Sequence, residues 1–207
     1  MKNIGIVLFV GGLVWGVVSC SNNGGGPPPV LTPSQMVAQG WQSYKQKNYQ
    51  SALNSFTKAI QAQANFTDAY NGAGWSNAKL NQMPEAINQF TSGYTYSSSS
   101  QPLQEQIEAG FALVSNVQKN YSLSAYWAGQ VLAVDSNWIF TRDVSVNSAD
   151  LLILRAEDYF AMAIFDSSLY EVQKLDARDS LIFTHNISTN VGRLQLANEI
   201  ERLRSLN

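Results

Sequence analysis

Side chains that carry out most enzyme chemistry are scarce in this chain. It contains one histidine, His185, and one cysteine, Cys20. A Ser-His-Asp triad or a Cys-His pair would have to use that histidine. No motif surrounds it, so we expect His185 to lie at the surface or to cap a helix. Zinc sites built from histidine and cysteine lack ligands, and the sequence therefore predicts no metal and no other cofactor.

Acid–base and phosphate chemistry are also poorly supported. Glu157 and Asp158 are neighbouring carboxylates, but adjacent residues on a helix point apart and would not flank one bond. The glycine run at residues 24–26 adjoins three prolines and lacks the strand and helix of a phosphate-binding loop. Residues 105–180 hold eleven acidic and five basic residues, and such a surface repels nucleic acid. We therefore expect no enzyme and no nucleic-acid partner.

A stretch of 34 residues occurs twice without gaps, because residues 33–66 align with residues 67–100. The matched pairs include Gly40 with Gly74, Trp41 with Trp75, Lys45 with Lys79, Ala52 with Ala86, and Phe56 with Phe90. Apolar residues recur at helical spacing on both sides of a turn near residues 46–49, so each copy predicts two antiparallel helices. A fixed period of this length indicates one supersecondary unit stacked on copies of itself.

The pattern resembles the tetratricopeptide repeat (TPR). That family places a small residue in the first helix, an alanine early in the second, and then an aromatic followed by another small residue. Each copy fits, with Gly40, Ala52, Phe56 and Ala59 in the first and Gly74, Ala86, Phe90 and Gly93 in the second. Looser copies fit residues 105–138 and 149–182, and one more helix near residues 189–206 would cap the stack. For residues 33–207 the resemblance thus implies an all-α, TPR-like α-solenoid of about four helix-turn-helix repeats plus a C-terminal capping helix.

An insertion at residues 139–148 separates the third copy from the fourth. It contains Arg142 and Asp143, and its alternating pattern is compatible with an extended segment. Insertions in repeat arrays tend to lie on one face and can take part in binding. The alternative is a plain connecting loop.

In TPR arrays the first helix of each repeat lines a concave groove. The resemblance implies that the groove of this chain is lined by Trp41, Tyr44, Lys45, Asn71, Trp75, Lys79, Asn116 and Glu157. Tryptophan and tyrosine dominate binding hot spots because they bury a large area at a low entropy cost. Two tryptophans beside two lysines would suit an extended peptide with a carboxylate. The alternative is that both tryptophans simply pack between helices.

The amino terminus has the features of a secretory signal peptide. Residues 1–19 combine one lysine, an apolar run at 4–18 and a small residue before the cysteine. The run is shorter than the roughly 20 apolar residues of a membrane-spanning helix. Residues 17–20, Val-Val-Ser-Cys, resemble a bacterial lipobox, which implies that Cys20 is acylated and becomes the new amino terminus. Two or more acyl chains anchor a protein stably.

The residue after the lipobox gives an expectation about the membrane. By the proteobacterial rule of the lipoprotein family, Ser21 implies the outer membrane, with the inner membrane and the cell surface left open. Residues 20–32 form a glycine- and proline-rich tether that cannot make a core. Fully extended, a tether of this length would keep the folded part within about 40 Å of the membrane.

Two hypotheses about function follow. The first is a lipid-anchored periplasmic scaffold or adaptor, which binds protein partners in an envelope complex of the outer-membrane assembly, pilus or secretion type. The alternative is a receptor lipoprotein that binds a peptide or glycan in the aromatic groove.

Overall fold

The computed structural model describes residues 30–97, 100–178 and 185–206 of the chain. This part is helical, apart from an isolated β-bridge between Ile139 and Asn147. The helices are α1 (Pro33–Lys45), α2 (Tyr49–Ala62), α3 (Thr67–Lys79), α4 (Met83–Tyr96), α5 (Gln101–Val117), α6 (Tyr121–Val134), α7 (Ser148–Ala161), α8 (Phe165–Arg178) and α9 (Asn190–Leu206). Cys20 and the signal peptide expected at residues 1–19 lie outside the described residues. None of the described helices is long and apolar enough to cross a bilayer.

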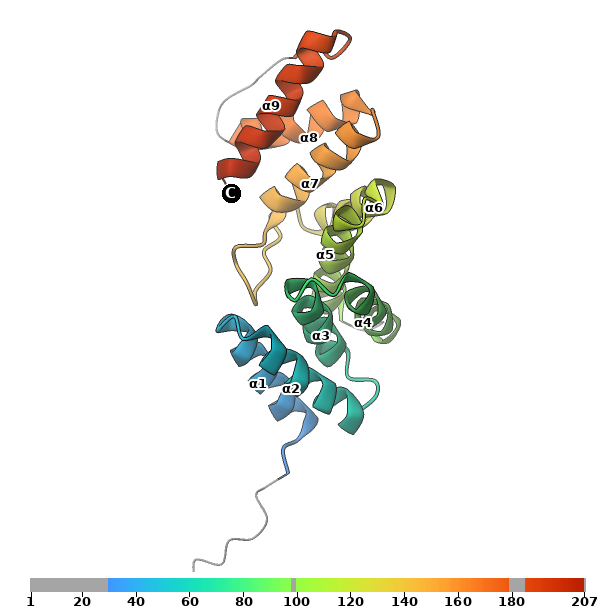
Figure 1. Ribbon diagram of the computed structural model, residues 1–207, viewed down its shortest axis with the longest axis vertical. Coiled ribbons are helices and arrows are strands. Elements are labelled where there is room, and N and C mark those ends of the chain that lie inside the picture. The colour runs from blue at the N-terminus through green and yellow to red at the C-terminus, as the bar shows by residue number, and fades with distance from the viewer. Residues whose placement is uncertain (1–29, 98–99, 179–184, 207) are drawn as a thin grey trace, which may run out of the picture. The chain divides into compact units, whose positions relative to one another are not determined.

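Residues 31–207 form one compact unit in which helices pack in chain order (Figure 1). Four helix pairs, α1–α2, α3–α4, α5–α6 and α7–α8, are followed by α9, which packs against α7 and α8. The first helices of successive pairs also contact one another, α1 with α3, α3 with α5, and α5 with α7. The predicted all-α solenoid of four repeats and a capping helix is therefore confirmed.

The same turn joins the two helices of every pair. Its central residue has a left-handed backbone, with φ between 59° and 61°, at Lys47, Asn81, Lys119 and Ala163. The next residue donates its N–H to a carbonyl five positions back, as Asn48 does to Ser43 at 2.9 Å and Ile164 does to Tyr159 at 2.8 Å. These are the hydrogen bonds of a Schellman motif, which satisfies the free carbonyls at a helix end. All four pairs thus share a backbone geometry, although only the first two share a clear sequence.

Glycines allow the helices to approach each other at two phenylalanine rings. A Cβ added at Gly40 or Gly72 would lie 2.5 or 2.2 Å from the nearest ring atom of Phe56. Phe56 is fully buried, and its ring sits against both α1 and α3. Gly74 and Gly110 stand in the same relation to Phe90 one repeat later. Gly40 and Gly74, which the sequence pattern includes, therefore make room for the phenylalanine of their own repeat, and Gly72 and Gly110 do the same from the following repeat.

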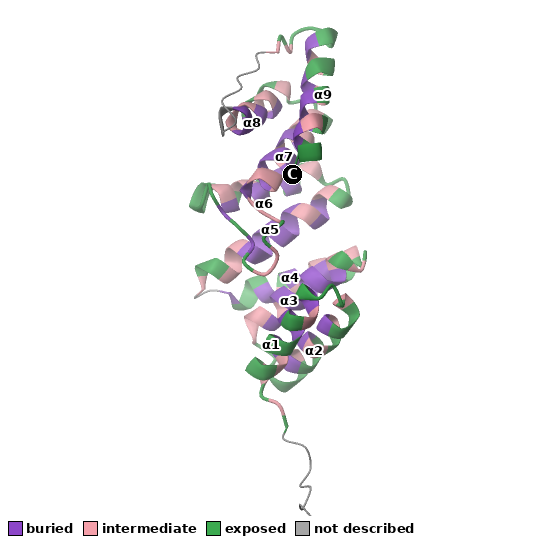
Figure 2. Ribbon diagram, turned by 90° about the vertical axis from the view of Figure 1, so that its left-hand side faces the viewer, coloured by how far each residue is buried: buried purple, intermediate pink, exposed green. Residues whose placement is uncertain are grey.

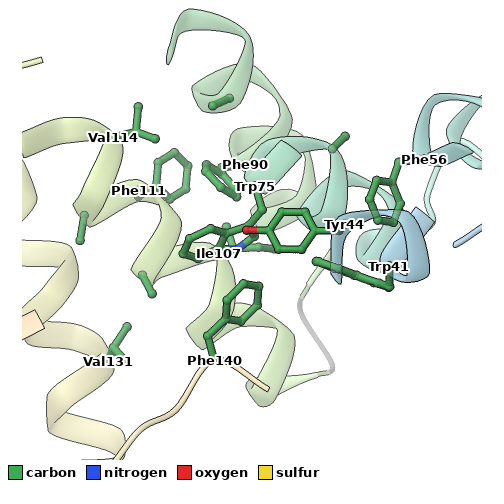
Figure 3. Packing of buried hydrophobic residues seen from close by; sticks show 14 of the residues in the cluster. Trp41, Tyr44, Phe56, Trp75, Phe90, Ile107, Phe111, Val114, Val131 and Phe140 are labelled. Carbon is green, nitrogen blue, oxygen red and sulfur yellow. The ribbon is translucent and has the colours of Figure 1, made fainter. Parts of the chain in front are cut away.

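Buried residues occur along the whole stack (Figure 2). Their side chains form two clusters. The larger one extends from α1 to the start of α7 and includes Trp41, Trp75 and Phe140 (Figure 3). The smaller one joins α7, α8 and α9 and includes Leu196 and Leu203. Phe140 lies between α6 and α7, so the segment predicted as an insertion contributes to the core of the first two repeats.

Candidate partner-binding groove

The loop between α6 and α7 lies on the face formed by α1 and α3. We call residues 138–147 the covering loop. Its backbone is internally bonded, since Phe140 N–H donates to Val146 O at 2.9 Å and Ser148 N–H donates to Trp138 O at 2.7 Å. A turn at its tip is closed by the N–H of Asp143, which donates to Phe140 O at 3.0 Å. The loop is thus an ordered hairpin-like element.

Phe140 brings the aromatic residues of the predicted groove together. Its ring stacks on Trp75 with centroids 4.3 Å apart, and it meets Trp41 edge-on at 6.1 Å and Tyr44 at 6.5 Å (Figure 3). Trp41 and Trp75 are only 3% and 2% exposed. The two tryptophans therefore lie on the face expected for a groove and are also packed in the core, where the chain's own phenylalanine contacts them.

Both indole N–H groups bond within the chain. Trp41 Nε1 donates to Asp68 Oδ1 at 3.0 Å, and Trp75 Nε1 donates to the backbone oxygen of Gln106 at 3.2 Å. Asn71, a further predicted groove residue, donates from Nδ2 to Gln106 Oε1 at 2.8 Å. These polar contacts join α1 to α3 and α3 to α5, so they hold successive repeats in register.

Two ion pairs attach the covering loop to α3. Arg142 bonds to Asp68 at 3.2 Å and lies over the Trp41 ring at 4.8 Å from the centroid, and Lys79 pairs with Asp143 at 3.2 Å. Burial raises the pKa of the Asp68 carboxyl, which Arg142 and the Trp41 N–H partly counteract. Asp143 behaves in the opposite way. Although burial raises its pKa, hydrogen bonds from Ser145 and Lys79 outweigh burial and lower it overall.

Tyr44 and Lys45, at the end of α1, differ sharply in exposure. Tyr44 is 2% exposed, and its buried hydroxyl has no hydrogen-bond partner among the described residues. Burial raises the pKa of that hydroxyl, and the nearby Asp143 carboxylate adds to the effect. Lys45 is exposed. Together with Tyr49 and the covering loop, the two residues line a cavity of about 320 Å³.

The remaining predicted groove residues lie further along the stack and bond to other helices. Asn116 donates from Nδ2 to Asp158 Oδ1 at 2.8 Å, which joins α5 to α7. Asp158 is fully buried, and burial raises its pKa from 3.8 to about 6. Glu157 forms an ion pair with Arg204 of α9. The predicted set is thus divided. The covering loop is contacted by, or shares a cavity with, Trp41, Tyr44, Lys45, Trp75 and Lys79. Asn71 bonds to α5, Asn116 bonds to α7, and Glu157 pairs with α9.

The residues that organise this face were not all evident in the sequence. Phe140 and Asp68 were not among the expected groove residues, and Arg142 and Asp143 were noted only as part of an insertion. The sequence held one signal for the role of this segment, namely a tryptophan and a phenylalanine beside two opposite charges. A loop surrounded by water has no need of large aromatic side chains, so their presence indicates burial. Its partners were hidden because Asp68 and Arg142 are 74 positions apart in the chain.

No group of three or more His, Cys, Asp or Glu side chains that could hold a metal occurs in the described ranges. His185 lies in the segment before α9, and α9 stands at the opposite end of the stack from α1 (Figure 1). The face formed by α1 and α3 combines aromatic and charged side chains. It offers aromatic rings, a carboxylate and an ammonium group, arranged across α1 and α3.

The sequence matches no protein-family model and no curated protein. Solved structures resemble the fold. PilW, described as a widely conserved type IV pilus biogenesis factor, is 15% identical with a TM-score of 0.61, over 84% of this chain and 77% of that chain. A kinesin light chain from Podosopora anserina with TPR-like repeats is 12% identical with a TM-score of 0.60, over 85% and 98%.

A double mutant of MamA RS-1 is 12% identical with a TM-score of 0.58, over 84% of this chain and 97% of that chain. At these identities the likeness concerns the fold alone. It agrees with the pairwise helix stacking, the repeated turns and the glycine–phenylalanine contacts described above. The described part of the chain is a TPR-like α-solenoid.

Proposed function

We propose that this protein is a lipid-anchored scaffold that binds protein partners in a bacterial envelope complex. The observation that carries the proposal is the solenoid itself, because stacked helix pairs create a long surface with few residues suited to catalysis. One structure that it resembles is a type IV pilus biogenesis factor. Pilus machinery is therefore the first complex to examine, followed by outer-membrane assembly and secretion complexes.

The burial of the tryptophans favours a protein scaffold over a glycan receptor. A sugar stacks on the open face of an aromatic ring, whereas Trp41 and Trp75 are almost fully buried and Phe140 occupies the face of Trp75. Exposed aromatic residues occur elsewhere, at Tyr94, Tyr96 and Tyr126, where the exposed fractions are 36%, 43% and 54%. Exposed aromatic side chains of this kind are enriched at protein interfaces.

The anchor is proposed from the sequence alone. The pattern at residues 17–20 supports acylation of Cys20, and Ser21 supports a place in the outer membrane, facing the periplasm. Expressed in a bacterial host, Cys20→Ala should move the protein from the membrane pellet to the soluble fraction and abolish incorporation of labelled palmitate. Asn23→Ala is the matched control in the tether and should change neither. A Cys20→Ala protein that stays in the membrane would disprove the lipid anchor.

An experiment in intact cells tests whether the chain has a protein partner. Crosslinking followed by affinity isolation of the tagged chain should recover the same protein partner in repeated experiments. Cys20→Ala should reduce recovery if the complex forms at the membrane. Isolation of the chain alone after crosslinking, under conditions that capture a known envelope complex in the same cells, would overturn the scaffold proposal.

A further inference from the structure

The contacts of the covering loop with the helices resemble those between two binding partners. One aromatic ring and two opposite charges on the loop each meet a complementary group on the helices. Phe140 stacks on Trp75, the Arg142 guanidinium bonds to Asp68, and the Asp143 carboxylate pairs with Lys79. The helix residues come from the first helix of repeat two. A face that binds these three groups so specifically in the same chain has the chemistry to bind them in another chain.

The fit of the loop is incomplete. The Tyr44 hydroxyl and Arg142 Nε are both buried without a hydrogen-bond partner among the described residues. A buried donor that loses its water without gaining a partner opposes the closed state. One of the loop's two ion pairs also stays partly open to water, with Lys79 and Asp143 side chains 32% and 24% exposed. An ion pair that water reaches contributes little to stability.

Two cavities adjoin the loop. One, of about 320 Å³, lies beside Tyr44 and the loop residues Thr141 to Val144. The other, an apolar cavity of about 240 Å³, is lined by Trp75, Met83, Leu113 and Val146 among others. The loop itself presents Ile139 and Val144 to solvent, at 53% and 72% exposure. The groove is therefore larger than the segment that fills it, and the loop leaves apolar side chains outside.

We propose that the covering loop is the resting occupant of a recognition groove on α1 and α3. The partner that replaces it presents the same groups, namely an aromatic side chain, a guanidinium two residues later and a carboxylate next to that. The pattern is the one the loop carries at Phe140, Arg142 and Asp143. The inference rests on the proposed protein-binding function and adds the chemistry of the partner and the means by which the groove is kept closed.

The test supplies the loop in trans. In the full chain, residues 139–146 are replaced by a glycine–serine linker of equal length, and a labelled peptide with the sequence of residues 138–147 is added. We expect the peptide to bind the loop-replaced chain and to bind the intact chain at least about tenfold more weakly, because the resident loop competes. Peptides carrying Phe140→Ala or Arg142→Ala should each lose at least about tenfold in affinity, whereas Val144→Ala, at an exposed position, should not.

A folded loop-replaced chain that does not bind the peptide overturns the inference. If the loop-replaced chain loses its helical structure, hydrogen exchange of the backbone amides in the intact chain tests the inference instead. The amides of Phe140 and Val146 should then exchange at least about tenfold faster than that of Ala73 in α3, since the loop opens while the helices stay folded. Equal protection at the three sites would show a permanent core element. Because the probe is the chain's own sequence, this result is independent of whether a cellular partner is recovered.

Discussion

Phe140 stacks on Trp75 at a centroid distance of 4.3 Å and an interplanar angle of 22°, although Trp75 belongs to repeat two and Phe140 to the loop after repeat three. Through this contact Phe140 covers the aromatic residues on the face formed by α1 and α3. A tryptophan that the repeat pattern places in a groove is in contact with the chain's own connecting loop. The predictions below concern the contacts that build this face and the repeats on either side of it.

Gly72→Ala should destabilise the junction of the first two repeats. The new Cβ would lie 2.2 Å from Phe56 Cζ, and that ring is fully buried and cannot move aside. We expect the free energy of unfolding to fall by about 1–3 kcal/mol, as measured by urea denaturation followed by circular dichroism. Gly129→Ala is the control, because its nearest contact would be an ordinary 3.5 Å to Arg155 Cζ. It should raise stability by up to about 1 kcal/mol through helix propensity. Equal effects of both substitutions would contradict the close approach.

Ala163→Gly should stabilise the fourth repeat. Ala163 has φ of 59°, where a Cβ is unfavourable and glycine is free of strain. We expect the free energy of unfolding to rise by up to about 1 kcal/mol, because glycine's extra freedom in the unfolded chain offsets part of the gain. Ala38→Gly, at an exposed position inside α1, should lower it by roughly 1 kcal/mol. Differential scanning calorimetry of the two variants shows whether each substitution raises or lowers stability. A loss of stability in Ala163→Gly would rule out the strained turn.

Asp158 should make stability depend on pH. Burial raises its pKa from 3.8 to about 6, so between these values the folded chain binds more protons than the unfolded chain. The free energy of unfolding should therefore fall as the pH rises through this window, by about 1–3 kcal/mol in total, and level off above it.

The check is Asp158→Asn, which keeps an acceptor for Asn116 and removes the titration. Urea denaturation from pH 4 to pH 7 should show a flatter profile for this variant. The exposed Asp166→Asn serves as control and should retain the slope of the unchanged chain. An identical slope in Asp158→Asn would assign the pH dependence to another group.

Asp68 and Arg142 should be energetically coupled across the chain. Removing Arg142 leaves the Asp68 carboxylate, whose side chain is 18% exposed, without its cation. A double-mutant cycle with Asp68→Asn and Arg142→Ala should give a coupling energy of about 0.5–3 kcal/mol. The exposed pair of Glu201 and Arg204, with side chains 72% and 56% exposed, should give less than about 0.5 kcal/mol in the same experiment. Coupling of similar size in both pairs would mean that the loop contact contributes nothing specific.

The repeats were predictable because their information is local. Gly40, Ala52 and Phe56 lie within one 34-residue unit, where Gly40 approaches the Phe56 ring closely and Ala52 is fully buried. The covering loop was not predictable in the same way, since its contacts to α3 join residues far apart in the chain, as Arg142 and Asp68 are at a separation of 74 positions. The turns were hidden for another reason. In the part of the chain that the structure describes, none of the residues with positive φ is glycine, so these turns lack the usual sequence signal for this conformation.

The two buried clusters meet at α7, which gives Leu151 and Leu154 to one and Leu152 and Ile153 to the other. Because α7 borders both clusters, the C-terminal helices can unfold locally without disrupting the larger cluster. We expect α8 and α9 to open as one cooperative unit while α1 to α6 and the loop stay intact. A force applied at the C-terminus would then be absorbed by that unit first, and the aromatic face would remain assembled under load.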